Sequence, residues 1–332
     1  MAERIGFTTT IPVEVIYASG NIPVDLNNIF ITDDNSMELV RDAEIKGFPR
    51  NMCGWIKGLY ASVKKHGIKK VIAVTQGDCS NTYALMEILQ MEGVEIIPFA
   101  YPYDRDQDML RLQIDKLREA FNVSEKEVEV FKKKLDKVRA KVHKIDRMTW
   151  EKNTITGFEN HYYLVSTSDM NGELFAFEKD IDTFLSSLKK RKPFDKEVRL
   201  GLIGVPPIFT NLYPFIEEKG ARVVFNEVQR QFAMPYQTDN IVEAYRLYTY
   251  PYDIFSRIDD IQEQIEMRKI QGLIHYVQSF CYRQLEDLIL RSKETRIPIM
   301  TLEGDNPAEL DERSKIRIEG FIEMLKRDKG RD

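Results

Sequence analysis

Short apolar runs rich in β-branched residues alternate with amphipathic, helix-like stretches over most of this chain. Runs with the composition of buried strands occur in both halves, at 69–75, 94–99, 199–204, 221–228, 272–279 and 297–304. Strands separated by helices pair in parallel, because each helix carries the chain back to the start of the next strand. The pattern therefore predicts an α/β fold with a parallel sheet in each half.

A highly charged helical region separates the two series of strands. Apolar residues recur at helical spacing from about 108 to 146, and the polar run KKRKPFDK at 189–196 ends the region. A chain of 332 residues is long enough for two globular domains. We expect doubly wound α/β domains at 1–107 and 196–332, with a helical segment at 108–195 between them.

The composition excludes several classes of protein. The net charge of −5 argues against a nucleic-acid-binding protein, whose domain is usually basic. No run of about 18 apolar residues occurs, so we expect no membrane span. The first residues lack the layout of a secretion signal, and three widely spaced cysteines do not suggest a disulfide framework. These features predict a cytoplasmic protein.

Two of the three cysteines follow predicted strands at matching positions in the two halves. The stretches VIAVTQGDC and LIHYVQSFC place Gln76 opposite Gln278 and Cys79 opposite Cys281. Each cysteine lies between the carboxyl end of a strand and the start of a helix, where open α/β sheets bind ligands and where a helix end favours a thiolate. Cys53 lies at the start of another predicted helix, near the same edge of the first domain.

These cysteines allow more than one interpretation. Cysteines are often small core residues, and this remains an alternative for all three. Structural zinc usually requires four ligands with paired spacings, and neither the cysteines nor the four histidines show such spacing. Three converging thiolates without an evident fourth ligand instead suit a [4Fe–4S] cluster with one open iron, where a substrate or water could bind.

Seven stretches distributed over the chain resemble those of a known family. They are PVEVIYASGNIPVDL, RNMCGWIKGLY, VTQGDC, GLIGVPPIFTNLYPFIEEKGARVVFNE, the FC pair at 280–281, IPIMTLEGD and SKIRIEGFIEML. In this order they are similar to the 2-hydroxyacyl-CoA dehydratase family. That family includes the D-components of the dehydratases, related subunits of benzoyl-CoA reductase and the double-cubane cluster proteins.

The resemblance implies a fold, a cofactor and a partner. The fold is two flavodoxin-like domains with a helical segment, and the cofactor is a [4Fe–4S] cluster held between the domains by cysteines that match Cys53, Cys79 and Cys281. The partner is a dimeric, ATP-hydrolysing activator with its own cluster, which delivers one low-potential electron to form a ketyl radical on an acyl-CoA thioester. This chain has no Gly-rich phosphate loop, so the ATP chemistry would lie on that partner. We expect a homodimer or a heterodimer with a related subunit.

The resemblance also suggests catalytic residues. In substrate-bearing subunits a hydroxyl residue near the cluster falls at about Thr9, and some carry a carboxylate where this chain has Ser19-Gly20-Asn21. Thr9 and Ser19 are therefore the candidate catalytic residues. A double-cubane site requires six cysteines, whereas the chain has three and could hold one ordinary cluster only.

Three functions remain open. The first is an enzyme component that dehydrates or reduces a 2-hydroxyacyl-CoA-like thioester. The second is an ATP-dependent reductase of small molecules related to the double-cubane proteins, and the third is a non-catalytic electron-transfer or cluster-carrying subunit. An elongated pocket from the surface to the cluster favours the first, a small sealed pocket the second, and a fourth protein ligand the third.

Overall fold

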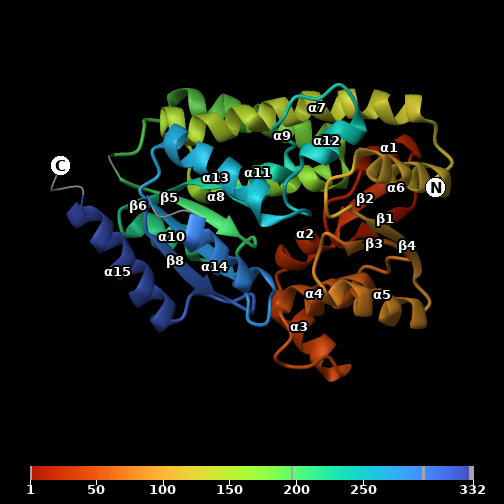
Figure 1. The fold of residues 1–332 in the computed structure, drawn as a ribbon, viewed down its shortest axis with the longest axis horizontal. Coiled ribbons are helices and arrows are strands. Elements are labelled where there is room, and N and C mark those ends of the chain that lie inside the picture. Colours follow the sequence, from red (N-terminus) through yellow and green to blue (C-terminus); the bar gives the residue numbers. More distant parts are fainter. Residues whose placement is uncertain (1, 196, 294–295, 329–332) are drawn as a thin grey trace.

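Two four-stranded sheets, each with all its strands parallel, form the framework of the computed structural model, which describes residues 2–195, 197–293 and 296–328 (Figure 1). The first contains β1 (Arg4–Phe7), β2 (Ile22–Asp25), β3 (Lys70–Gln76) and β4 (Glu95–Ala100), in the order β2-β1-β3-β4. The second contains β5 (Val198–Gly204), β6 (Ala221–Asn226), β7 (Gly272–Val277) and β8 (Ile299–Glu303), in the order β6-β5-β7-β8. The two sheets therefore have the same topology, and β7 is the counterpart of β3.

The first sheet is covered on both faces, because side chains of successive strand residues point to opposite sides. Ile72 and Val74 of β3 pack into a cluster with α1 and α6, whereas Val71 packs with α2 to α5 on the other face. The helices of this half are α1 (Val13–Ala18), α2 (Leu26–Ile31), α3 (Ser36–Ile45), α4 (Gly54–Lys65), α5 (Asn81–Met91) and α6 (Gln107–Ala120).

The second sheet is built in the same way. Leu273 of β7 packs on one face with α13 and α14, and Ile274 packs on the other with α10 and α15. The helices of this half are α10 (Leu212–Glu218), α11 (Glu227–Phe232), α12 (Ile241–Leu247), α13 (Ile254–Arg268), α14 (Arg283–Lys293) and α15 (Glu312–Asp328). The prediction of an α/β fold with two doubly wound parallel sheets is confirmed.

Two long helices from the middle of the chain, α7 (Glu125–Arg147) and α9 (Leu174–Ser187), lie at the top of the molecule in Figure 1. The shorter α8 (Gly157–Val165) lies below them, near α11. The helical pattern predicted from about 108 to 146 is interrupted between α6 and α7, where Asn122 has a φ of 52°. Ser124 then begins α7 as part of a capping box with Glu127.

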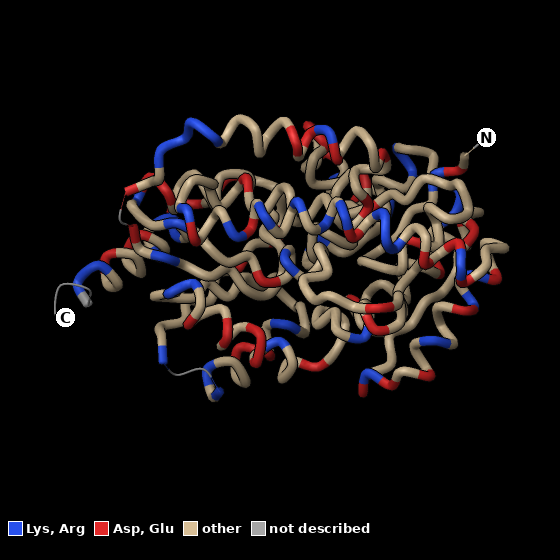
Figure 2. The backbone as a smooth tube through the Cα atoms, turned by 90° about the horizontal axis from the view of Figure 1, so that it is seen from above, with Lys and Arg blue, Asp and Glu red and all other residues tan. Residues whose placement is uncertain are grey.

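Charged residues of both signs are interspersed along the backbone (Figure 2). Among the described residues, no helix combines the length and the apolar character that a transmembrane helix requires. One apolar cluster extends from α4 of the first half to α10 and α15 of the second, and Cys53 and Cys79 pack at its edge. The two halves therefore share a hydrophobic core beside two of the three cysteines.

Candidate functional site

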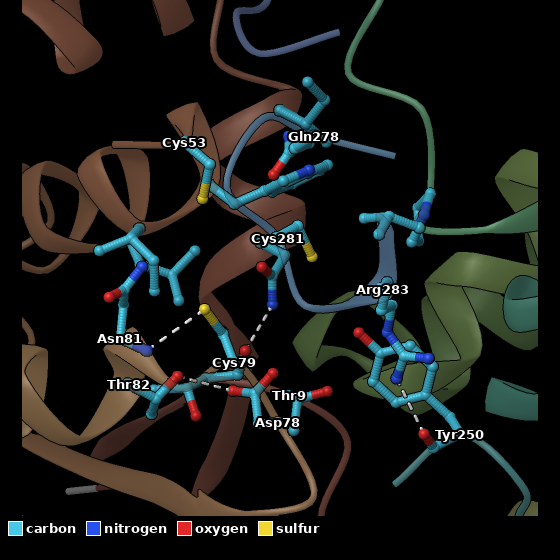
Figure 3. Close-up of a pocket in the computed structure, with 18 of the residues that line it drawn as sticks. Thr9, Cys53, Asp78, Cys79, Asn81, Thr82, Tyr250, Gln278, Cys281 and Arg283 are labelled. Carbon is cyan, nitrogen blue, oxygen red and sulfur yellow. Dashed lines mark hydrogen bonds between the residues drawn. The ribbon is translucent and has the colours of Figure 1, made fainter. Parts of the chain in front are cut away.

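All three cysteines line one cavity of about 130 Å³ at the carboxyl ends of both sheets (Figure 3). The loops after β1, β2 and β3 contribute to its wall, as do the loops after β5 and β7 and the start of α4. In a sheet of order 2-1-3-4 the crevice between the first and third strands is the usual ligand site, because the connections there leave in opposite directions. Cys79 and Cys281, which the sequence places at equivalent strand-to-helix corners, thus line the same cavity.

Each cysteine lies within two residues of the start of a helix. Cys53 is the N-cap residue of α4, Cys79 lies two residues before α5, and Cys281 lies two residues before α14. The backbone N–H of Asn81 donates to the sulfur of Cys79 at 3.4 Å. Unpaired N–H groups at helix starts stabilise negative charge, so each position suits a thiolate ligand.

The cysteines carry neutral thiols at neutral pH. Burial raises the pKa of Cys53 to about 11 and that of Cys79 to about 12, and it also raises the pKa of Cys281. All three are free of disulfide bonds. Metal binding to these groups would therefore release protons, as it does wherever thiolates are the ligands.

The side chains do not form a ready site for a single metal ion. Among the residues that the structure describes, no group of three or more His, Cys, Asp or Glu side chains is placed to hold one ion. In an iron–sulfur cluster each cysteine binds a separate iron atom, so three cysteine ligands need not converge on one point. The arrangement therefore argues against mononuclear zinc more than against a cluster.

Asp305 connects the segments that carry two of the cysteines. Its backbone carbonyl accepts a hydrogen bond from the N–H of Gly54 at 2.9 Å, and its carboxylate accepts from the N–H and hydroxyl of Ser279, both at 2.8 Å. Gly54 follows Cys53, and Ser279 lies two residues before Cys281. Asp305, which follows β8, thus connects the two halves through its backbone carbonyl, while its carboxylate holds the loop that carries Cys281.

Replacing Gly54 by alanine should destabilise this contact. A Cβ at Gly54 would overlap the carbonyl oxygen of Asp305 and lie 3.0 Å from Cδ1 of Ile208. Since overpacking of this kind costs about 1–3 kcal/mol, we expect a lower urea midpoint of unfolding. Gly320→Ala is the matched control, because a Cβ there meets nothing within 4 Å and alanine favours the helix. Equal midpoints for the two variants would contradict the contact.

The candidate catalytic residues lie in different places. Thr9 is buried and lines the cavity beside Asp78 (Figure 3). Ser19 follows α1, where its hydroxyl donates to the carbonyl of Ile16 at 2.7 Å, and it is not among the described residues that line the cavity. The structure therefore brings Thr9, but not Ser19, together with the cysteines.

A larger groove of about 930 Å³ adjoins the cysteine cavity. Asn28, Ile31, His161, Val165 and Pro207 line both spaces. The groove runs between β2 and α2 on one side and α8 with the loop after β5 on the other. The sequence did not indicate this groove, because its wall comes from segments far apart in the chain.

Two buried carboxyl groups lie between the cavity and the groove. Asp25 lines the cavity and Asp169 lines the groove, and the N–H of Asp25 donates to a carboxyl oxygen of Asp169 at 2.8 Å. Burial raises the pKa of both groups, and the nearby charge of Asp25 further raises that of Asp169, to about 7. Asp25 is the last residue of β2, and Asp169 follows α8; neither carries a local sequence motif.

These raised pKa values predict a pH-dependent effect of Asp25→Asn. Between about pH 4 and 7 the folded chain holds more protons on this pair than the unfolded chain, so the contribution of the pair to stability falls as pH rises. Asparagine remains a good N-cap for α2 and removes one charge. The variant should therefore gain stability relative to the wild type as pH rises from 5 to 8.

Urea unfolding of both proteins at several pH values measures this gain. Comparison with the wild type cancels the contribution of every other group whose protonation changes in this range, because those groups are the same in both proteins. A stability difference between the variant and the wild type that stays constant with pH would contradict the raised pKa values of Asp25 and Asp169.

The sequence model of a family described as 2-hydroxyglutaryl-CoA dehydratase, D-component, matches residues 8–325. Among curated proteins, none shows significant similarity to the chain. The match begins directly after β1, covers strands β2 to β8 with the helices between them, and includes all three cysteines. The chain therefore belongs to the family of the 2-hydroxyglutaryl-CoA dehydratase D-component.

Proposed function

We propose that this chain is the cluster-bearing component of an enzyme that dehydrates or reduces a 2-hydroxyacyl thioester. Cys53, Cys79 and Cys281 would hold a [4Fe–4S] cluster, and an ATP-hydrolysing activator would supply the electrons. The observation that carries this proposal is the convergence of the chain's three cysteines, from loops of both sheets, on one cavity. Family membership supports a dehydratase-type component and an association with an activator.

The chemistry of the donor set supports the cluster. Three free thiols that line one cavity are the soft ligands that iron–sulfur clusters use. When bound, such a cluster supplies single electrons at low potential. The helix starts behind Cys53, Cys79 and Cys281 would offset the negative charge of the thiolates.

The chain's own residues provide the remaining chemistry of the cavity. Burial raises the pKa of Asp78 to about 6, so this carboxyl can hold or release a proton near neutral pH. The hydroxyl of Thr82 donates to Asp78 at 3.0 Å and fixes its orientation. Thr9, on the same wall, would donate a hydrogen bond to a substrate oxygen.

The adjoining groove favours a thioester over a very small substrate. Because five residues line both spaces, a substrate could reach the cysteine cavity through the groove. Arg4 is the only Lys or Arg among the described residues lining the groove. We therefore place the acyl–pantetheine arm in the groove and the charged nucleotide outside it, since phosphates require cationic partners.

Anaerobic purification followed by iron and sulfide analysis and EPR spectroscopy tests the cluster. We expect about four iron and four sulfide per chain and the EPR signal of a reduced [4Fe–4S] cluster. Equilibrium titration with 2-hydroxyglutaryl-CoA, and with the same acyl group on a pantetheine lacking the nucleotide, tests the substrate. Similar affinities for the two ligands would support the position of the nucleotide outside the groove. A chain that contains no iron and binds neither thioester would overturn the proposal.

A further inference from the structure

His161 lies where the groove meets the cysteine cavity. It is carried by α8 and is one of the residues that line both spaces. The centre of its ring lies 6.1 Å from that of Phe158, at an interplanar angle of 29°, and 5.2 Å from that of Tyr213. These aromatic neighbours hold the plane of the half-buried ring.

The hydrogen bond on one ring nitrogen fixes the proton on the other. The side-chain amide nitrogen of Gln229 lies 3.0 Å from Nδ1 of His161. An amide NH₂ group can only donate, so Nδ1 must accept, and the proton of a neutral imidazole then resides on Nε2. Gln229 is itself buried on α11, which holds the donor in place.

The Nε2–H group is available to a ligand. Within the described chain it has no hydrogen-bond partner, and it is not among the fully buried atoms that lack one, so it is accessible; the residue that carries it lines both spaces. Burial lowers the pKa of His161 to about 4, so the ring stays neutral at physiological pH. A neutral imidazole with a fixed N–H is a hydrogen-bond donor that does not transfer its proton.

We propose that His161 is a substrate-binding residue whose Nε2–H donates a hydrogen bond to the carbonyl oxygen of the thioester at the junction of groove and cavity. This role rests on the proposed function, which supplies the thioester. Negative charge develops on a carbonyl oxygen when the carbonyl gains an electron, so a donor in place beforehand strengthens its bond as the reaction proceeds. Gln229 is then a positioning residue, since it selects the tautomer.

The tautomer can be measured without substrate. Nitrogen-15 NMR of the full chain labelled at histidine, with the His161 signals identified by their loss in His161→Phe, should show a neutral ring protonated at Nε2 from pH 5.5 to 8. In Gln229→Leu we expect a mixture of the two neutral tautomers. A protonated ring, or a proton on Nδ1, in the wild-type chain would overturn the proposal.

The hydrogen bond itself can be measured with a labelled thioester. For bound 2-hydroxyglutaryl-CoA with carbon-13 at the thioester carbonyl, we expect a lower C=O stretching frequency in the wild type than in His161→Phe, and about tenfold tighter binding. His161→Gln, which keeps an N–H donor, should recover part of both effects. His66→Phe is the matched control, because His66 lies outside both spaces and its loss should change neither value.

The outcomes separate this proposal from the one on which it rests. Unchanged affinity and C=O frequency in His161→Phe, with normal binding to the wild type, would overturn the role of His161 alone. A wild-type chain that does not bind the thioester would overturn the proposed substrate and this role together.

Discussion

Replacement of any one of Cys53, Cys79 and Cys281 by serine is expected to reduce the bound iron and sulfide from about four of each per chain to nearly none. Each cysteine comes from a different loop, and each would bind a separate iron atom, so none can replace another. Serine occupies a similar volume but binds iron poorly, because a hydroxyl is harder and less acidic than a thiol. Iron and sulfide analysis and EPR spectroscopy of anaerobically purified variants measure the loss.

Ser80→Ala provides the control for this series. Ser80 follows Cys79 and lines the same cavity, and its side chain makes no capping hydrogen bond to α5. We expect this variant to retain the wild-type iron content and EPR signal. Full iron in one of the three serine variants would exclude that cysteine as a ligand, and zinc in place of iron in the wild type would overturn the cluster assignment.

The strands that precede Cys79 and Cys281 were predictable because each contains a continuous apolar run. Strands β1 and β2 were missed, because they are four residues long and contain Gly6 and Pro23, which disfavour strands. Pro23 is tolerated because β2 is an edge strand. Because β2 was not predicted, the position of Asp25 as its last residue was not predicted either.

The cysteine cavity follows from local sequence, whereas the groove does not. The residues at which a strand ends and a helix begins can be located from the sequence. Because the two sheets have the same strand order, Cys79 and Cys281 then lie at corresponding edges of their sheets. His161 and Asp169 belong to helical segments whose position over the sheets depends on long-range packing, so no local pattern identifies them. The domain boundaries at 107 and 195 stay predictions, because the hydrophobic clusters extend across them.

Arg139→Met is expected to lower the free energy of unfolding by about 3–5 kcal/mol. Arg139 of α7 donates to the carboxylate of Glu14 on α1 at 2.7 Å, and the two side chains are 2% and 0% exposed. The hydroxyl of Tyr245 on α12 lies 2.9 Å from the same carboxylate, so the pair joins helices from three parts of the chain. Methionine would fill much of the space but leave Glu14 buried without its cation.

Two further variants decide whether the unpaired charge of Glu14 causes the loss of stability expected for Arg139→Met. Replacing both partners, in Arg139→Met with Glu14→Leu, removes that charge, so the double variant should be more stable than Arg139→Met alone. The hydroxyl of Tyr245 keeps an acceptor in the double variant, because the carbonyl of Ile11 lies 2.7 Å away. Lys326→Met removes one partner of an exposed pair and should change stability by less than about 1 kcal/mol. Urea unfolding of the four proteins gives the comparison. If the double variant is as unstable as Arg139→Met, lost packing at Arg139 rather than the buried charge of Glu14 controls the anchoring of α7 on α1.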